Sequence, residues 1–132
     1  MSKNVLGGIL DLIGVRHLLT TFRFSYDGFI SCFKSEVAFR QEVICAIVNL
    51  IAVSVLPLSF TIRFMMIVLS VIVLCFELIN TGVEAVVDLV TKDWRPLAKK
   101  AKDVCSTAVF FANTLFFLSW VVIIVKLIYR DI

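Results

Sequence analysis

The stretch FELINTGVEAVVD, residues 76–88, places three carboxylates and one amide at the end of a strongly apolar run. These polar residues are Glu77, Asn80, Glu84 and Asp88. On a helix with 3.6 residues per turn they fall within an arc of about 80°, and the other face consists of leucine, isoleucine and valine. An intramembrane carboxylate is costly and is by default a functional hypothesis. The stretch therefore predicts a functional helix face at the edge of a membrane span.

The composition places the whole chain in a membrane. Of its 132 residues, 61% are hydrophobic and the mean hydropathy is +1.03, whereas soluble domains rarely exceed roughly half apolar residues. At this length we expect one domain, residues 1–132. The N-terminal stretch contains charged residues and lacks a small-residue cleavage site, so we expect no signal peptide. The four cysteines have no CxxC spacing, and we expect them to be reduced and to pack between other side chains.

Three apolar segments are long enough to cross a hydrocarbon core of about 30 Å. We expect helices over 36–57, 61–90 and 99–129, with Pro57 ending the first of them. The segment of about 1–33 has apolar residues at helical spacing, which is typical of an amphipathic helix lying on a membrane surface. The predicted fold class is an all-α membrane protein with three transmembrane helices and an N-terminal surface helix.

The positive charges divide unevenly between the two sides of the expected bilayer. Of the 13 lysines and arginines, ten lie on the side of the N-terminus, where residues 91–103 also fall, and three lie on the opposite side. Cytoplasmic loops carry an excess of lysine and arginine. We therefore expect a cytoplasmic N-terminus and a C-terminus on the other side of the membrane.

Two more polar clusters fall at the same boundary. KSEVAFRQE, residues 34–42, precedes the first span. Within it Glu36 and Arg40 are four residues apart, so a plain intrahelical salt bridge is an alternative to a functional role. LAKKAKDVCS, residues 97–106, begins the third span. Its lysines are also consistent with the ordinary excess of positive charge on the cytoplasmic side.

Acids, an amide and cations at three helix ends are what metal-assisted phosphoryl transfer needs. Carboxylates can hold Mg²⁺, cations can bind phosphates, and one carboxylate can accept a proton from an attacking hydroxyl. The chain contains neither GxxxxGK[ST] nor GxGxxG, so a nucleotide site here would differ from those of soluble kinases. A proton- or cation-coupled transporter could use the same acids. A purely structural membrane protein is a further alternative, which leaves Glu77 uncompensated.

Three motifs resemble those of the small prokaryotic membrane diacylglycerol kinases. They are EVAFRQE (36–42), ELINTGVEAVVD (77–88) and AKDVCSTAV (101–109). The resemblance runs without gaps over about residues 24–125 and is strongest to the enzymes of Gram-negative bacteria. The related undecaprenol kinases of Gram-positive bacteria share much of the pattern, and Gln41 favours the diacylglycerol enzymes.

The resemblance implies an ATP-dependent lipid kinase that phosphorylates the primary hydroxyl of diacylglycerol to phosphatidic acid. It implies Mg²⁺ as the cofactor, ATP and diacylglycerol as partners, and no nucleic-acid partner. It also implies a homotrimer with active sites shared between protomers. The location implied is the bacterial inner membrane, at its cytoplasmic interface, with the C-terminus in the periplasm. Undecaprenol is the alternative acceptor, and a small acid-coupled transporter is the less favoured alternative function.

The resemblance also implies roles for individual residues. Glu77 corresponds to the general base, and Glu36 and Glu84 to the carboxylates that hold the divalent ion. The positions that correspond to nucleotide contacts are Glu84, Asn80, Asp93, Trp94, Arg95, Lys102, Asp103, His17 and Phe24. The positions that correspond to contacts with the lipid substrate are Ala38, Phe39, Arg40, Gln41, Glu42, Arg63, Ser106 and Trp120.

Overall fold

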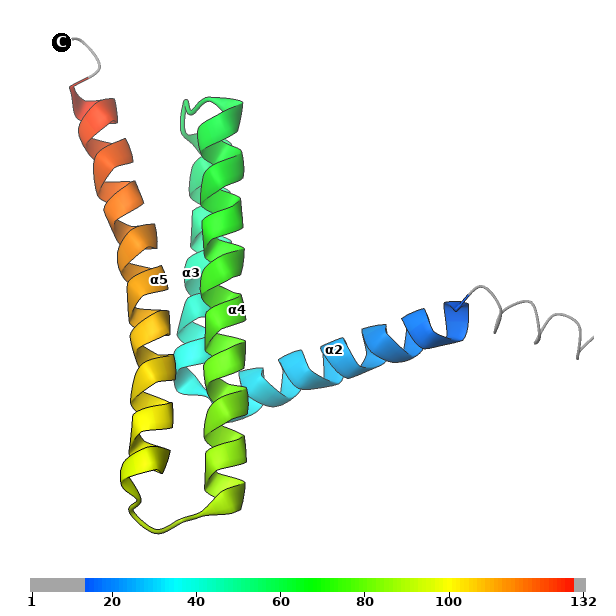
Figure 1. Ribbon diagram of the computed structural model, residues 1–132. Helices are drawn as coiled ribbons and strands as arrows, with labels where there is room; N and C mark the ends of the chain where they lie inside the picture. The colour runs from blue at the N-terminus through cyan, green and yellow to red at the C-terminus, as the bar shows by residue number, and fades with distance from the viewer. Residues whose placement is uncertain (1–13, 130–132) are drawn as a thin grey trace, which may run out of the picture. The chain divides into compact units, whose positions relative to one another are not determined.

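The computed structural model describes residues 14–129, which form four α-helices and, within that range, no strand. In chain order the helices are α2 (Val15–Ser35), α3 (Val37–Val55), α4 (Phe60–Val90) and α5 (Pro96–Ile128) (Figure 1). Helices α3, α4 and α5 are each long and apolar enough to cross a membrane. The predicted all-α membrane fold with three spans is confirmed. The part of the expected surface helix before residue 14 lies outside the described residues.

The chain divides after Ser35 into two compact units, and the first contains α2. Gly14 precedes this helix with a φ of 69°, a left-handed conformation that glycine adopts without a steric penalty. Leu18, Phe22, Phe29 and Phe33 lie along one stripe of α2, because their spacing follows the helical period. All four side chains are exposed. This apolar stripe is consistent with the expected helix on a membrane surface.

The second unit contains α3, α4 and α5, and its helix ends follow from local sequence. Leu56 ends α3 in an extended conformation because Pro57 follows it. Ser59 caps α4 by accepting a hydrogen bond from the Ile62 backbone N–H at 3.4 Å. Helix α5 begins at Pro96, three residues before the expected start at 99, because proline fits the first helical turn.

The α3–α4 turn is closed by an arginine. Arg63 donates hydrogen bonds of 3.1 Å to the carbonyl oxygens of Leu58 and Leu56. These two carbonyls follow the end of α3 and have no helical donor of their own. Arg63 therefore stabilises the turn at the end of α4 that lies opposite the carboxylate-rich stretch.

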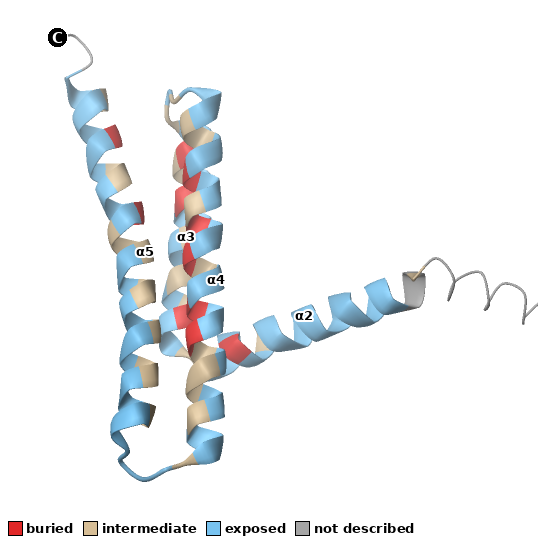
Figure 2. Ribbon diagram, in the orientation of Figure 1, coloured by how far each residue is buried: buried red, intermediate tan, exposed pale blue. Residues whose placement is uncertain are grey.

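Helix α4 packs against both α3 and α5 (Figure 1). The core cluster is small and consists of Val53, Met66, Val73, Phe116 and Ile123. Most other large apolar side chains of the three helices are exposed, as Figure 2 shows by colour. The three helices thus leave broad apolar faces for lipid or for further copies of the chain.

The four cysteines are free. Cys32 is buried and Cys105 is half-buried, as expected for packing residues. Cys45 and Cys75 lie on exposed surface of the chain, so they do not pack within it. Both belong to helices that are candidate membrane spans, and they lie on the outward faces of these helices.

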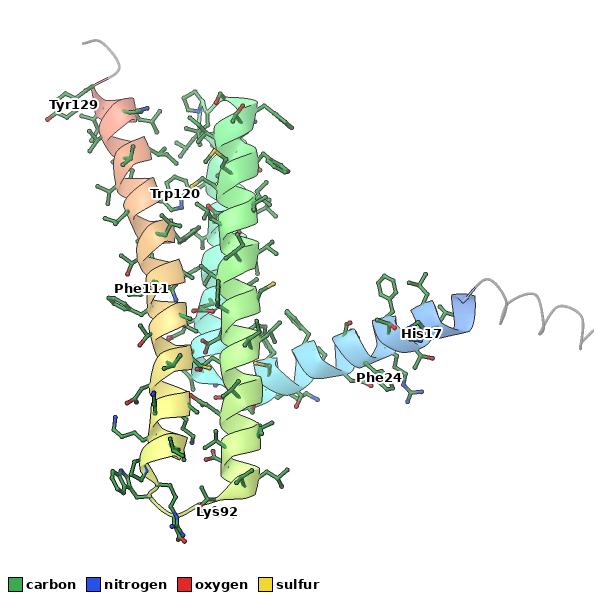
Figure 3. The ribbon with its side chains drawn as sticks, in the orientation of Figure 1. His17, Phe24, Lys92, Phe111, Trp120 and Tyr129 are labelled. Atoms are coloured by element: carbon green, nitrogen blue, oxygen red, sulfur yellow. The ribbon has the colours of Figure 1, made fainter. Side chains whose placement is uncertain are left out.

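A polar layer, formed by Asn49, Ser70 and Trp120, crosses the middle of the three-helix unit. Asn49 donates to the Met66 carbonyl at 3.1 Å and to Ser70 Oγ at 3.4 Å. Trp120 Nε1 donates to Asn49 Oδ1 at 3.1 Å, so its indole turns towards α3 (Figure 3). Hydrogen bonds between apolar helices add to packing inside a membrane. This mid-membrane layer therefore joins all three spans.

Candidate active site

Four carboxylates gather at one end of the three-helix unit. Glu77 of α4 is 5% exposed, which is unusual for an acid. Glu42, Glu84 and Glu36 lie close enough for their charges to act on it. Glu36 immediately precedes α3, and Glu42 lies in the second turn of that helix. The structure therefore brings the predicted base, Glu77, together with both predicted metal ligands.

The predicted polar face of α4 points inward over most of its length. Glu77 and Asn80 are buried and Glu84 is half-buried, whereas Leu78 and Ile79 are exposed. Only Asp88, at the far end of the arc, is exposed. The helical period thus places the acids against α3 and α5, and it turns the apolar side outward.

Asn80 links the buried part of this face to Glu84. Its side-chain Nδ2 donates to Glu84 Oε1 at 3.2 Å. Its Oδ1 is buried and has no hydrogen-bond partner among the described residues. A buried acceptor without a donor is destabilising. Asn80 is therefore well placed to accept a hydrogen bond from a group that enters the site.

Glu42 is held by a residue that the sequence motifs do not include. Asn113 of α5 donates from Nδ2 to Glu42 Oε1 at 2.7 Å. The second carboxylate oxygen, Oε2, is buried and has no partner in the described part of the chain. Asn113 lies in the mostly apolar stretch VFFANTLFF, and an amide side chain inside such a span is the signal that could have identified it.

A polar groove of about 330 Å³ opens where α4 joins α5. It contains five of the residues predicted to contact the nucleotide, namely Asp93, Trp94, Arg95, Lys102 and Asp103. The remaining lining residues are Val87, Asp88, Thr91, Lys92, Ala98 and Lys99. The groove brings these cations to the end of α4 that carries the acids, as phosphate binding needs.

Ion pairs join the walls of the polar groove. Lys102 Nζ lies 2.6 Å from Asp88 Oδ1, and Lys99 pairs with Asp103 one helical turn away. In the loop, the Asp93 backbone N–H donates to Thr91 Oγ1 at 3.1 Å. Lys102 and Asp103, two of the charged residues predicted to contact the nucleotide, are therefore already paired in this structure.

A larger groove of about 590 Å³ lies beside the same turn, but no acid lines it. Its walls are mostly valine, alanine, leucine and proline, with Arg95 as the one charged side chain. Phosphoryl transfer needs charges that bind phosphate and a base, so the chemistry points to the smaller groove and the acids. Volume alone would have selected the wrong place.

Two of the predicted lipid contacts, Arg63 and Trp120, lie away from the acids. Arg63 is 14 residues before Glu77 on α4, which is about 21 Å along the helix axis. Trp120 belongs to the mid-membrane layer. Phe39 is fully buried within the chain, and Arg40 is half-buried. The exposed residues among the predicted lipid contacts are Ala38, Gln41 and Ser106.

His17 and Phe24 belong to the other unit of the chain. Both lie on α2 and are exposed (Figure 3). Their expected contacts with the nucleotide stay a prediction, as do the contacts of the other residues with lipid.

A magnesium site fits the residues present only if substrate supplies part of the coordination. Within residues 14–129, no group of three or more histidine, cysteine, aspartate or glutamate side chains is arranged to hold a metal ion. Mg²⁺ commonly uses one or two carboxylates and completes its shell with water and phosphate oxygens. Glu36 and Glu84 both lie within charge range of Glu77, and their role as magnesium ligands stays a prediction.

A buried carboxylate, flanking acids and a cationic groove, all at one end of three membrane-length helices, define a membrane-embedded phosphotransferase. The family model described as prokaryotic diacylglycerol kinase matches residues 23–124. That range covers more than half of the chain, and the chain belongs to the prokaryotic diacylglycerol kinase family.

Individual relatives agree with the family match. A diacylglycerol kinase of Pseudomonas aeruginosa is 36% identical over 111 residues, which cover 84% of this chain and 90% of that protein. One from Haemophilus influenzae is 34% identical over 113 residues, covering 81% and 91%. One from Escherichia coli is 26% identical over 111 residues, covering 84% and 91%. The expected kinase class is confirmed, and neither the undecaprenol kinase nor the transporter alternative is favoured.

Proposed function

We propose that the chain transfers the γ-phosphate of ATP to the primary hydroxyl of diacylglycerol and so forms phosphatidic acid. The observation that carries this proposal is the position of Glu77, a nearly fully buried acid in a membrane-length helix with three other carboxylates around it. The same helix ends in the polar groove with its lysines and arginine. Along α4, Glu84 lies between Glu77 and the polar groove, whose cations come from the loop after α4 and from α5.

Glu77 acts as the general base in this proposal. Its carboxylate accepts the proton of the lipid hydroxyl while the hydroxyl oxygen forms a bond to the γ-phosphorus. The bond between that phosphorus and the β–γ bridging oxygen breaks, and ADP leaves with the electron pair. Asn80 Oδ1, which is buried and has no donor among the described residues, accepts a hydrogen bond from another group that enters the site, because the one hydrogen of the lipid hydroxyl goes to Glu77.

The polar groove binds the nucleotide. Lys102 and Arg95 contact phosphates, Asp103 points to the ribose or base, and Trp94 covers the nucleotide from the loop. Glu36 and Glu84 would hold Mg²⁺, which when bound neutralises charge on the phosphates. This arrangement needs no glycine-rich loop, because carboxylates and cations supply the contacts.

The location of the acids suits a lipid acceptor. Drawing the hydroxyl of diacylglycerol into water would expose its acyl chains, at about 0.8 kcal/mol for each CH₂ group. A buried acid at the end of a membrane helix brings the base to the hydroxyl instead. We place the protein in the bacterial inner membrane, with the N-terminus and the polar groove in the cytoplasm and the C-terminus in the periplasm. The uneven distribution of lysine and arginine supports that orientation.

We also propose that the chain functions as a homotrimer. Each span leaves a broad apolar face that one copy cannot cover. The oligomeric state can be measured by cross-linking in detergent and in native membranes.

Phosphate transfer from labelled ATP in mixed micelles tests the proposed reaction. Diacylglycerol and undecaprenol are offered separately, with the Glu77→Gln variant as the blank. We expect transfer to diacylglycerol and little transfer to undecaprenol. Preference for undecaprenol would keep the residue roles and change the acceptor, whereas no transfer to either by folded protein with Mg²⁺ would overturn the proposal.

A further inference from the structure

Each of the three spans carries two polar residues that lie seven positions apart. The pairs are Glu42 and Asn49 in α3, Ser70 and Glu77 in α4, and Asn113 and Trp120 in α5. Seven residues are close to two helical turns, so both members of a pair lie on the same face of their helix. The rise between them is about 10 Å. The three helices therefore form two polar layers inside the bundle.

One member of each pair belongs to the mid-membrane layer, and the other forms a second layer, called here the acid layer. The acid layer consists of Glu42, Glu77 and Asn113. Within it Asn113 donates to Glu42 at 2.7 Å, and Glu42 lies within charge range of Glu77. In each layer a residue of α5 donates a hydrogen bond to a residue of α3. Asn113 donates to Glu42 in the acid layer, and Trp120 donates to Asn49 in the mid-membrane layer. Each layer thus connects α3 to α5 through a polar side chain.

A small cavity lies between the two layers. Its volume is about 10 Å³, which is about the smallest space that can hold one water molecule. The lining residues are Glu42, Cys45, Ala46, Ser70, Val73, Asn113 and Phe116. Three of them carry polar groups, and a buried water needs two to four polar partners. The cavity is therefore suited to one water molecule.

A water molecule in this cavity would provide a hydrogen-bond donor that the Glu42 carboxylate lacks. Oε1 accepts a hydrogen bond from Asn113, but Oε2 is buried and has no partner among the described residues. Ser70 Oγ donates to the Ile67 carbonyl at 2.8 Å and can accept a further hydrogen bond. A water can donate one hydrogen to Glu42 and the other to Ser70, and so join the acid layer to the mid-membrane layer.

We propose that this cavity is a binding site for one water molecule and that Asn113, together with this water, positions the Glu42 carboxylate beside Glu77. Asn113 touches neither reacting atom in the proposed reaction, so it is a positioning residue. The water fixes one carboxylate oxygen and the Asn113 amide fixes the other. The catalytic end of α4 is thereby tied to the packing of all three spans. The expected effect of Asn113 on turnover rests on the proposed function. The hydrogen bonds of Glu42 to Asn113 and to the water do not depend on it.

Nuclear magnetic resonance of the unliganded protein in micelles tests the contacts without any reaction. We expect the two side-chain amide protons of Asn113 to have well-separated resonances and to receive magnetisation from water. Glu42→Leu removes the acceptor and should bring the resonances together. Ala46→Val fills the cavity and should remove the transfer from water while the separation remains. Unchanged resonances in Glu42→Leu, or no transfer from water in the parent protein, would overturn the proposal.

Kinetics then test the positioning role. Asn113→Leu keeps the shape of the side chain but removes its donor, and we expect kcat to fall about tenfold while KM for ATP changes less than about twofold. A general loss of packing would instead lower the folded fraction and leave both constants of the folded enzyme unchanged. Ser119→Ala is the matched control, because Ser119 donates only to Leu115 of its own helix at 2.8 Å.

The outcomes separate this proposal from the proposed function. If Asn113→Leu retains the parent kcat, Asn113 does not position Glu42 for catalysis. If the parent protein transfers no phosphate at all, the proposed function fails, and the resonances of Asn113 still decide whether the water site and the hydrogen bond exist.

Discussion

Lys102 Nζ lies 2.6 Å from Asp88 Oδ1, and this ion pair joins α5 to α4 across the polar groove. Both side chains remain partly in contact with solvent. A pair of this kind contributes little to stability and exchanges readily for another partner. Nucleotide phosphates carry more charge than one carboxylate, so they can take Lys102 from Asp88.

We therefore predict that Asp88→Asn strengthens nucleotide binding. The change frees Lys102 and removes a negative charge that repels phosphate. The expected result is a KM for ATP lower by about two- to fivefold, as is reasonable for a solvent-accessible pair. The measurement is initial rate against ATP concentration at constant lipid. Asp27→Asn, which breaks the exposed Arg23–Asp27 pair on α2, is the control. A higher KM would mean that Asp88 holds Lys102 in its binding position.

A second prediction distinguishes the role of Glu77 in the reaction from the role of the polar groove in nucleotide binding. Glu77→Gln keeps the size of the side chain but cannot accept the hydroxyl proton. We expect turnover to fall by about 10²- to 10⁴-fold, the usual contribution of a general base. Nucleotide affinity, measured by equilibrium binding of a fluorescent ATP analogue, should stay near that of the parent. Turnover like that of the parent would remove Glu77 from the role of base.

A third prediction concerns the proposed magnesium ligands. Glu84→Gln removes one of two carboxylates, so we expect half-maximal activity to need several times more Mg²⁺, or activity to be lost. The measurement is a Mg²⁺ titration at saturating ATP. Asp27→Asn changes an exposed acid on α2 and should leave the Mg²⁺ requirement close to that of the parent. An identical Mg²⁺ dependence in Glu84→Gln would exclude Glu84 as a ligand.

The periodicity of the sequence was sufficient to predict the three membrane-length helices and the inward face of α4. Apolar runs of sufficient length predict three spans, and the 3.6-residue period places Glu77 and Asn80 on one side of a helix. These features depend only on residues near each other in the chain. The start of α5 at Pro96 differed by a few residues because a proline is tolerated in the first turn of a helix.

Contacts between distant parts of the chain could not be predicted in this way. Asn113 and Glu42 are 71 residues apart, and their hydrogen bond depends on how α3 and α5 pack around α4. Periodicity predicts which residues share the inward face of a helix. It does not predict which of them lie at the same height as a given residue of another helix. Asp88 was visible in the sequence, but its partner Lys102 follows from the length and shape of the loop between α4 and α5. Both contacts therefore needed a structure.

The mid-membrane layer leads to a final prediction about stability. Asn49→Leu removes the acceptor of Trp120 and the donor to Ser70, so two polar side chains lose a partner inside the bundle. Interhelical hydrogen bonds in membranes contribute about 0.6–1.7 kcal/mol each, and we expect the free energy of unfolding in micelles to fall by about 1–3 kcal/mol. Turnover per folded molecule should change little, because the acid layer lies about 10 Å away along the helices.

Reversible unfolding in a denaturing detergent measures this change. Ser54→Ala is the matched control, because Ser54 is exposed on the same helix and donates only to the Leu50 carbonyl at 2.7 Å. We expect the control to unfold like the parent. Equal stability of Asn49→Leu and the control would show that apolar packing alone holds the three spans together. A loss of turnover in folded Asn49→Leu would instead show that the mid-membrane layer supports the acid layer.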